Sequence, residues 1–517
     1  MIDRVFLIVI DSLGIGALPD AKDYGDEGSD TLASVMTSKK ASLENLKSLG
    51  LFNINGENGG IDFPRAAFAR MAEKSNGKDT IIGHWEMCGV VSERDMPTYP
   101  DGFPKGIIEE FEKRCGRGTL CNKPYSGTKV IADYGKEHIE TGKLIVYTSA
   151  DSVFQIAAHE DIVPIEELYR YCEIAREILQ GEHGVGRVIA RPFEGEHPYT
   201  RTSRRHDYAI LPPHETTLDL VKNAGLETVC IGKISDIFAS QGVTKAIKTS
   251  GNTDGMTKAL AVVKNDFKGF CFINLVDFDS VYGHRRDIDG YAAALTEFDK
   301  WLPEFMNSMR ENDVLMITGD HGCDPGFKGT DHTREYTPLL VYGKQIMPLN
   351  LGVRESFADI GASVCEMLGI ENTLYGNSFF KELRMTKERL CAHAKEAMKN
   401  SYSPYSNCKV GAALLAKSGK VYLGCNIENA SFSPTICAER SAFAAAVSAG
   451  EREFLALAVC GGKNGVIDGA FYPCGVCRQV IREFCSDDFP IYVLNGSEII
   501  SLTLKDLLPH SFSNEVM

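Results

Sequence analysis

Residues 5–10 read Val-Phe-Leu-Ile-Val-Ile, and this short apolar run is followed directly by an aspartate. The same pattern occurs at three places: 5–10 with Asp11, 272–276 with Asp277 and Asp279, and 314–317 with Asp320. Runs of this length are typical of strands buried in a central sheet. A single aspartate after a strand is most often a helix N-cap. Since ligands of open α/β sheets gather at the carboxyl ends of strands, three such runs instead predict one site assembled from distant sequence.

Length and composition narrow the class of protein. The chain has 517 residues, which suits two or three domains better than one core. No apolar run approaches the roughly 18 residues of a membrane span, and the first run lacks the cleavage site of a signal peptide. A net charge of −15 without a basic block argues against binding to nucleic acid or to an anionic membrane. The 16 cysteines suggest reduced thiols in a cytoplasmic protein, and a bound metal.

The order of segments predicts an α/β fold with an insertion and a second domain. Residues 1–383 alternate strand-like and helix-like segments and carry the excess of acidic residues. A stretch at about 95–210 differs in its prolines and contains a predicted helix, 165–179, so we interpret it as a cap over the sheet edge. Residues 386–400 have helical spacing and open the next domain. The expected domains are therefore 1–383, with its core at about 1–94 and 211–383, and 384–517.

Six side chains of the first domain have the chemistry of a two-metal site. They are three carboxylates and three imidazoles: Asp11, Asp279, His284, Asp320, His321 and His332. Mixed oxygen and nitrogen ligands suit manganese, zinc or iron better than calcium. Two such cations can bridge a phosphate and stabilise its attacking and leaving oxygens. The acidic composition of this domain agrees with such a site, because cations rather than basic side chains would neutralise the phosphate.

A two-metal phosphate site also needs a nucleophile. Residues 78–86 read Lys-Asp-Thr-Ile-Ile-Gly-His-Trp-Glu, which places Thr80 in a polar turn. A hydroxyl becomes a good nucleophile when a metal or a base removes its proton, so Thr80 is a candidate for a phosphorylated residue. The alternative interpretation is that Thr80 only caps the helix that follows.

Together these segments resemble the phosphopentomutases of the alkaline-phosphatase-like superfamily. The resemblance rests on Asp11, Asp79-Thr80-x-x-Gly83-His84-Trp85-Glu86, Asn274-Leu275-Val276-Asp277-x-Asp279-x-x-x-Gly283-His284-Arg285-Arg286, Asp320-His321-Gly322 and Asp331-His332-Thr333-Arg334-Glu335. It covers residues 1 to about 383 and implies an alkaline-phosphatase-like sheet with an inserted cap domain. It also implies interconversion of ribose (or deoxyribose) 1-phosphate and 5-phosphate through a phosphothreonine and a sugar bisphosphate, which would act as an activator.

The resemblance assigns a role to each candidate residue. One manganese ion would be held by Asp11, Asp320 and His321, and the other by Asp279, His284 and His332. Thr80 would be phosphorylated. The sugar phosphate would be bound by five residues: Ser149, Asp151, Arg187, Arg201 and Lys233. The basic ones suit a remote phosphate, and the aspartate suits a sugar hydroxyl.

Three cysteines and a glutamate in the second domain have the spacing of a catalytic zinc site. Cys437 lies two residues before Glu439, and Pro473-Cys474-Gly475-Val476-Cys477 follows later in the chain. Three thiolates leave a fourth zinc position for water, and the nearby carboxylate would shuttle its proton. This is the pattern of zinc deaminases with Cys as the first ligand. We expect Arg440 and Arg478 to offset the excess negative charge. A structural zinc site or a reactive thiol pair is the alternative.

The second domain resembles the cytidine deaminases. The matching motifs are Tyr402-Ser403-Pro404-Tyr405-Ser406, Val410-Gly411-Ala412-Ala413-Leu414, Gly424-Cys425-Asn426-Ile427-Glu428-Asn429-Ala430-Ser431, Cys437-Ala438-Glu439-Arg440 and Pro473-Cys474-Gly475-x-Cys477-Arg478-Gln479. The resemblance implies an α/β/α fold and a homo-oligomer. It also implies ribose binding by Asn426 and Glu428, one zinc ion on Cys437, Cys474 and Cys477, and Glu439 as proton shuttle. The family usually has Phe where this chain has Cys408, and losing that aromatic face would weaken base binding by about 1 kcal/mol.

The two resemblances predict a bifunctional enzyme of nucleoside salvage. It would act on pentose phosphates and on (deoxy)cytidine, which it would deaminate to (deoxy)uridine, with two manganese ions and one zinc ion as cofactors. One alternative is a related metal-dependent phosphomutase or phosphatase that acts on another phosphate ester, such as phosphoglycerate. The other is a mutase whose second domain is an inactive, zinc-stabilised oligomerisation module.

Overall fold

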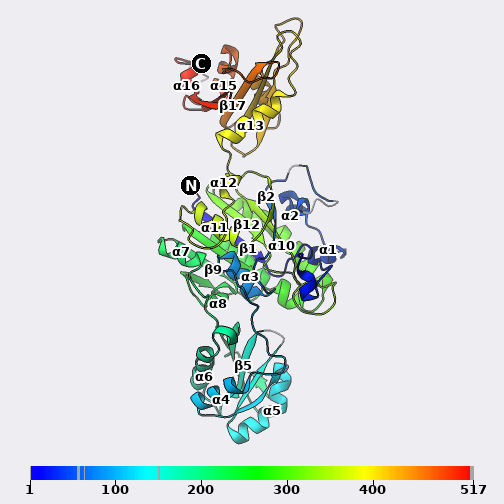
Figure 1. Cartoon of the computed structure of the whole chain (residues 1–517), viewed down its shortest axis with the longest axis vertical. Coiled ribbons are helices and arrows are strands. Elements are labelled where there is room, and N and C mark those ends of the chain that lie inside the picture. Colours follow the sequence, from blue (N-terminus) through cyan, green and yellow to red (C-terminus); the bar gives the residue numbers. More distant parts are fainter. Residues whose placement is uncertain (1, 55–58, 63, 150–151, 513–517) are drawn as a thin grey trace. The chain divides into compact units, whose positions relative to one another are not determined.

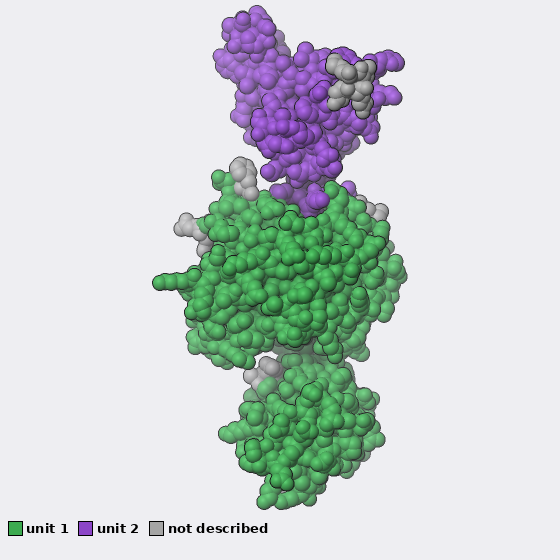
Figure 2. All heavy atoms as spheres, turned by 180° about the vertical axis from the view of Figure 1, so that it is seen from behind, with its two compact units in different colours: residues 1–342, 350–380 green, residues 343–349, 381–517 purple. Residues whose placement is uncertain are grey.

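The computed structural model describes residues 2–54, 59–62, 64–149 and 152–512. The chain forms two compact units, residues 1–342 with 350–380 and residues 343–349 with 381–517, which Figure 2 shows in different colours. Among the helices of the described ranges, none is both long and apolar enough to cross a membrane.

An eight-stranded sheet forms the centre of the first unit (Figure 1). In spatial order its strands are β10 (Lys245–Ile247), β9 (Glu227–Ile231), β11 (Gly269–Leu275), β1 (Arg4–Ile10), β12 (Asp313–Thr318), β13 (Thr337–Tyr342), β2 (Ala67–Met71) and β14 (Asn350–Arg354). The pairs are parallel, apart from the antiparallel pairs that β13 makes with β12 and β2. The three apolar runs form the adjacent strands β11, β1 and β12. The predicted α/β fold is therefore confirmed.

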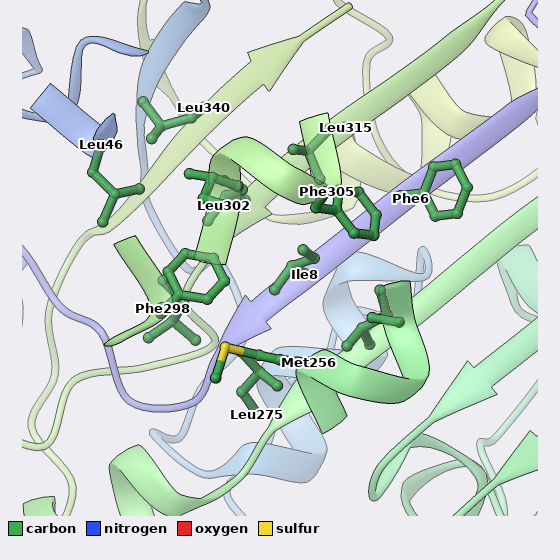
Figure 3. Close-up of a cluster of buried hydrophobic side chains, with 14 of the residues drawn as sticks. Phe6, Ile8, Leu46, Met256, Leu275, Phe298, Leu302, Phe305, Leu315 and Leu340 are labelled. Carbon is green, nitrogen blue, oxygen red and sulfur yellow. The ribbon is translucent and has the colours of Figure 1, made fainter. Parts of the chain in front are cut away.

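Helices pack on both faces of this sheet. The helical segments of residues 1–94 and 211–367 are α1 (Thr31–Met36), α2 (Glu44–Leu49), α3 (Thr80–Met87), α7 (Thr217–Asn223), α8 (Ile234–Ile237), α9 (Asn252–Lys264), α10 (Ile288–Ser308) and α11 (Ala358–Met367), with the short helices η1 (Ala21–Tyr24) and η2 (Leu51–Asn53) and the π-helical turn η4 (Phe278–Gly283). On one face, Phe6 and Ile8 of β1 pack among Met256, Phe298 and Phe305 of α9 and α10 (Figure 3). On the other face, α7 and α8 contact β9 and β11. Because β1 is covered on both faces, it is apolar from Val5 to Ile10, and its first residue, Arg4, is paired with Asp313.

The segment between α3 and α7 forms a smaller sheet with helices of its own. Its elements are α4 (Lys105–Cys115), β3 (Thr119–Pro124), α5 (Gly127–Thr141), β4 (Leu144–Thr148), β5 (Val153–His159), α6 (Ile165–Ile178), η3 (Gly181–His183), β6 (Arg187–Glu194), β7 (Thr200–Arg201) and β8 (His206–Ala209). The strand order is β3-β4-β5-β6-β7, and β8 pairs with β6. Helices α4 and α6 share one buried cluster with Val146 and Phe154, whereas α5 packs against Ile145 on the other face. We call this segment the cap.

The second unit has three layers. Its elements are α13 (Lys387–Met398), β15 (Cys408–Ala416), β16 (Val421–Cys425), α14 (Ala438–Ser448), β17 (Phe454–Lys463), α15 (Gly475–Phe484), β18 (Pro490–Asn495), β19 (Glu498–Thr503) and α16 (Leu504–Leu507), and α12 (Phe380–Leu383) lies at its boundary. The sheet order is β16-β15-β17-β18-β19. Leu390 of α13 packs on one face, and Phe443 of α14 and Ile481 of α15 on the other. Gly411 and Gly424 permit this packing, because a Cβ at either would lie about 2 Å from a helix carbonyl, at 2.1 and 2.2 Å respectively.

We expect the replacement Leu302→Ala to destabilise the first unit by about 2–5 kcal/mol, because it removes a fully buried side chain of α10 and leaves a cavity. Both tryptophans, Trp85 and Trp301, lie in this unit, so urea unfolding followed by tryptophan fluorescence reports on it separately. The matched control is Val353→Ala, whose side chain is 58% exposed and whose loss should change the free energy of unfolding by less than about 0.5 kcal/mol. Equal effects of the two replacements would contradict this account of the core.

Candidate metal and substrate sites

Three strands bring the predicted carboxylates to one edge of the central sheet. β1 lies between β11 and β12 and is parallel to both, with the ends of all three strands in register. Asp11 follows β1 directly, Asp279 lies in the turn η4 after β11, and Asp320 lies just beyond β12. The strand order therefore accounts for the meeting of residues that are hundreds of positions apart in the sequence.

The first set of potential ligands is Asp11, Asp320 and His321, whose ligand atoms lie within 4.8 Å of one another. His321 Nε2 is 3.6 Å from Asp11 Oδ1 and 3.3 Å from Asp320 Oδ2. All three side chains are buried. Burial lowers the pKa of His321 to about 4, so its ring is neutral at physiological pH and keeps a lone pair for a cation.

The second set is Asp279, His284 and His332. Each of the two imidazole Nε2 atoms lies 3.3 Å from a carboxylate oxygen of Asp279, and the two Nε2 atoms are 3.1 Å apart. His321 stacks on His332 with ring centroids 4.0 Å apart, so the two sets adjoin. His284 Nδ1 donates to Thr330 O at 2.6 Å, which orients its Nε2 toward the carboxylate.

The side chains present fit two divalent cations. Three buried carboxylate oxygens have no hydrogen-bond partner among the described residues: Asp11 Oδ1, Asp279 Oδ1 and Asp320 Oδ2. Burial, together with the negative charges of Asp320 and Asp279, raises the pKa of Asp11 well above its usual value. Cations would satisfy these oxygens and offset their repulsion, and the mixed oxygen and nitrogen donors suit manganese, zinc or iron. The structure thus brings together all six side chains of the predicted two-metal site.

Thr80 is the first residue of α3 and lies beside the first set. Its hydroxyl is 3.2 Å from His321 Nε2, and its side chain is buried. Asp79 caps the helix, because its carboxylate accepts from two backbone N–H groups of the first turn at 2.9 and 3.2 Å. The interpretation of Thr80 as the cap is therefore wrong, and its hydroxyl is free of that role. The close approach of α3 needs Gly83, since a Cβ there would lie 2.3 Å from Asp320 O.

A cavity of about 710 Å³ joins Thr80 and the second ligand set to the cap. Four predicted substrate residues line it: Ser149, Arg187, Arg201 and Lys233. The fifth, Asp151, lies outside the described residues. Arg191 and Arg205 also line the cavity, although the sequence did not single them out. Arg187 and Arg191 are on the same face of β6, so the two-residue period of a strand is the signal that could have identified Arg191.

Two helix N-termini of the second unit bring three thiols together. Cys437 is the N-cap of α14, Cys474 is the N-cap of α15, and Cys477 lies in the first turn of α15. The sulfur atom of Cys474 is 3.7 Å from that of Cys437 and 3.5 Å from that of Cys477. Tetrahedral Zn–S bonds of about 2.3 Å place sulfurs roughly 3.8 Å apart, so the set fits one zinc ion. A hydrogen bond from Cys477 lowers the pKa of Cys437 to about 5, which supplies a thiolate at neutral pH.

The other predicted residues of the second unit lie close to these thiols in the fold. Glu439 lies in the first turn of α14 and is 4% exposed, and burial raises its pKa. The backbone of Ile427 pairs with that of Ile436, which brings Asn426 and Glu428 beside the segment that carries the first thiol. A group with a raised pKa next to a metal-binding set is suited to proton transfer.

Hydrogen bonds orient the side chains of the two residues that are predicted to bind ribose. Asn426 Oδ1 accepts from Val410 N at 2.8 Å, and its Nδ2 donates to Cys408 O at 2.9 Å. Glu428 accepts from the backbone N–H groups of the 405–406 turn at 2.9 and 3.2 Å. Cys408, at the usual aromatic position, is half-buried at the start of β15.

The two arginines near the thiols differ in their contacts. Arg440 Nη2 lies 3.9 Å from Cys437 Sγ, where it can offset thiolate charge as expected. Arg478 instead donates to the carbonyls of Pro473 and Leu507, at 2.7 and 2.6 Å. Among the described residues, Arg478 therefore has no hydrogen bond to a thiol that would support its expected role in charge compensation.

Comparison with protein families gives two matches along the chain. The model of the Metalloenzyme superfamily matches residues 3–372, and that of the cytidine and deoxycytidylate deaminase zinc-binding region matches residues 384–493. A solved cytidine deaminase from Burkholderia pseudomallei is 44% identical, with a TM-score of 0.23, and covers 25% of this chain and 100% of its own.

Curated relatives cover the first part of the chain. The phosphopentomutase of Lachnoclostridium phytofermentans is 60% identical over 385 residues, which are 73% of this chain and 98% of the relative. The phosphopentomutase of Clostridium novyi is 52% identical over 388 residues, which are 74% of this chain and 100% of the relative. The chain therefore belongs to the phosphopentomutase family of the Metalloenzyme superfamily, and it continues into a cytidine and deoxycytidylate deaminase zinc-binding region.

Proposed function

We propose that this protein is a bifunctional enzyme of nucleoside salvage. Its first domain, residues 1–383, interconverts ribose or deoxyribose 1-phosphate and 5-phosphate, and its second, residues 384–517, deaminates cytidine or deoxycytidine to the uridine nucleoside. The phosphopentomutase that is 60% identical supports the first activity, and the deaminase family match supports the second. A separate phosphorylase, which releases pentose 1-phosphate from a nucleoside, would link the two reactions.

One observation carries the mutase proposal. The Thr80 hydroxyl is 3.2 Å from His321 Nε2 of the first set of potential ligands, and Thr80 lines a cavity together with the second set and several arginines. When bound, two manganese ions supply positive charge that stabilises phosphate oxygens and acidifies a nearby hydroxyl. One would be held by Asp11, Asp320 and His321, and the other by Asp279, His284 and His332.

The side chains of the first domain then perform two phosphoryl transfers. Phosphorylated Thr80 gives its group to the free hydroxyl of the sugar phosphate, so that the P–O bond to Thr80 breaks as a bond to the sugar oxygen forms. The resulting bisphosphate returns its other phosphoryl group to Thr80 and leaves as the isomeric monophosphate. A sugar bisphosphate from solution would phosphorylate the free enzyme in the same way, as an activator. The sugar phosphate is held by Ser149, Asp151, Arg187, Arg201 and Lys233.

The second domain uses a proton shuttle beside a thiolate set. A zinc ion held by Cys437, Cys474 and Cys477 supplies the Lewis acidity that makes water nucleophilic. Glu439 accepts a proton from a water molecule whose oxygen bonds to the pyrimidine carbon that bears the amino group. It delivers one proton to the ring nitrogen and then one to the amino group, so that the C–N bond breaks and ammonia leaves. The raised pKa of Glu439 supports this role, because a carboxylate that binds a proton more readily can accept one and pass it on. The ribose hydroxyls are held by Asn426 and Glu428.

We also propose that the second domain assembles the protein into a homo-oligomer in the cytoplasm. Several large apolar side chains near its thiol-bearing segments are exposed, among them Tyr402 at 58%, Ile427 at 48% and Phe432 at 75%. Such exposure supports contact with another copy. All 16 cysteines are free, which supports a reducing compartment. Sedimentation velocity at micromolar concentration tests the assembly, and a monomer would contradict it.

The replacement Thr80→Ala should abolish mutase turnover, because no hydroxyl remains to carry the phosphoryl group. ³¹P nuclear magnetic resonance of ribose 1-phosphate incubated with the Mn²⁺-loaded enzyme measures this directly. Deamination by the same preparation should be unchanged, and Thr80→Ser, which keeps a hydroxyl, should retain part of the mutase activity. A Thr80→Ala enzyme that still interconverts the sugars would exclude Thr80 as the phosphorylated residue. A wild-type enzyme that prefers phosphoglycerate would overturn the pentose assignment.

The replacement Glu439→Gln should lower kcat for cytidine by about 10²- to 10⁴-fold, since the amide keeps the shape of the side chain but cannot move the proton. The fall in ultraviolet absorbance during deamination is the measurement, with bound zinc determined in the same samples. Mutase activity serves as the control and should not change. Retained deamination would remove Glu439 from the mechanism. If zinc-loaded wild type does not deaminate, the second domain is an oligomerisation module.

The replacement Cys408→Phe should lower KM for cytidine about fivefold, because an aromatic face is worth about 1 kcal/mol against the base. Initial rates at varied cytidine concentration give this value. Cys408→Ala is the matched control and should leave KM close to that of wild type. An unchanged KM in the Phe variant would place this position away from the base.

A further inference from the structure

We propose that His84 and Asn274 are positioning residues that orient Asp11 and Asp320 for metal binding and tie both carboxylates to the helix that carries Thr80. This inference rests on the proposed mutase function, although its main test is metal binding. Both side chains are buried, and neither belongs to the six predicted ligands. They come from different elements, α3 and β11.

The contacts of His84 determine which of its nitrogens carries the proton. Nδ1 donates to Thr80 O at 2.8 Å, and the same N–H group lies 3.2 Å from Asp320 Oδ2, where it attracts this oxygen without a hydrogen bond. In the neutral ring Nε2 is then an acceptor, and it faces Asn274 Nδ2 at 3.4 Å. The ring also stacks on Phe272, with centroids 5.5 Å apart, whereas its orientation is set by the hydrogen bonds at its two nitrogens.

Asn274 links His84 to Asp11, the residue that follows β1. Its Nδ2 donates to Asp11 Oδ2 at 2.8 Å, which leaves Asp11 Oδ1 turned toward His321. The two protons of one amide group thus serve Asp11 and His84. Within β11, Asn274 is 1% exposed among apolar neighbours, so an uncharged donor there has a specific partner rather than water.

One oxygen of each of these two carboxylates accepts a hydrogen bond, and the other oxygen is left for a cation. Asp320 Oδ1 accepts from Ser12 N at 2.9 Å, as Asp11 Oδ2 accepts from Asn274. The two oxygens without a hydrogen bond, Asp11 Oδ1 and Asp320 Oδ2, are those nearest to His321 Nε2. Partners of metal ligands commonly change metal affinity or activity by about 10- to 100-fold. His84 adds to this a direct contact with the backbone of Thr80.

The test measures Mn²⁺ binding to the full-length, metal-free protein by isothermal titration calorimetry, with free Mn²⁺ followed in parallel by electron paramagnetic resonance. Asn274→Ala should raise the Kd of one of the two sites by about 10- to 100-fold and leave the other, formed by Asp279, His284 and His332, unchanged. Phe272→Leu is the packing control, since it keeps every hydrogen bond of the network. It should leave both Kd values unchanged.

Two conservative replacements of His84 distinguish the roles of its two nitrogens. His84→Asn keeps an amide nitrogen where Nδ1 donates to Thr80 O, whereas His84→Gln places its amide nearer the position of Nε2. We expect His84→Asn to retain more of the mutase kcat than His84→Gln, because only the former keeps the link to the helix of Thr80. Phosphothreonine content by intact mass should fall in the same order. Because both variants keep a polar group, they decide the question if Asn274→Ala does not fold.

The inference is overturned if both Mn²⁺ Kd values are unchanged in Asn274→Ala, or if Phe272→Leu has the same effect as the polar replacements. It is also overturned if the two His84 variants lose kcat and phosphothreonine equally. Failure of the proposed function looks different. In that case wild type binds two Mn²⁺ ions, and the variants weaken one site, but pentose phosphates are not turned over.

Discussion

Three carboxylates buried at the ends of three neighbouring parallel strands are the constraint on which the first unit depends. An isolated buried charge costs several kcal/mol, so Asp11, Asp279 and Asp320 can share this edge only if other groups compensate them. The structure supplies backbone N–H groups, an asparagine amide and imidazoles, and it leaves three carboxylate oxygens for cations. The apolar strands contribute as well, because they place the charged groups at a rigid edge of the sheet.

The strands and most of the site could be predicted because the informative residues follow one another in the chain. Each apolar run leads into its own aspartate, and Asp320 and His321 are adjacent. The helix at 165–179 appears as α6 (Ile165–Ile178) for the same reason, since its periodicity is local. The thiol and glutamate pattern of the second unit is equally compact, and it appears at the N-termini of α14 and α15.

The residue roles that the sequence could not reveal depend on contacts between distant segments, or on which of two neighbouring residues caps a helix. Asp79 and Thr80 can both cap a helix, and only the backbone shows that Asp79 does so. Asn274 is an ordinary polar residue until β11 is placed beside β1, where its amide meets Asp11. Arg191 reaches the cavity because β6 turns alternate residues toward it. The role of Asn274 is tertiary and no local pattern marks it, whereas the cap is a choice between two neighbours and Arg191 follows from the two-residue period of β6.

The two sites also differ in how they select their metals. The first uses carboxylates and imidazoles, and on such ligands zinc binds more tightly than manganese, so affinity alone does not reserve the site for manganese. The second uses three thiolates, which strongly favour a soft cation such as zinc over manganese. The potential ligands of the first site lie between residues 11 and 332 and depend on the whole sheet, whereas those of the second lie at two helix N-termini. Since each unit contains its own set of potential ligands, either metal centre would form without a ligand from the other, and the difference in ligand softness would direct zinc to the thiolates.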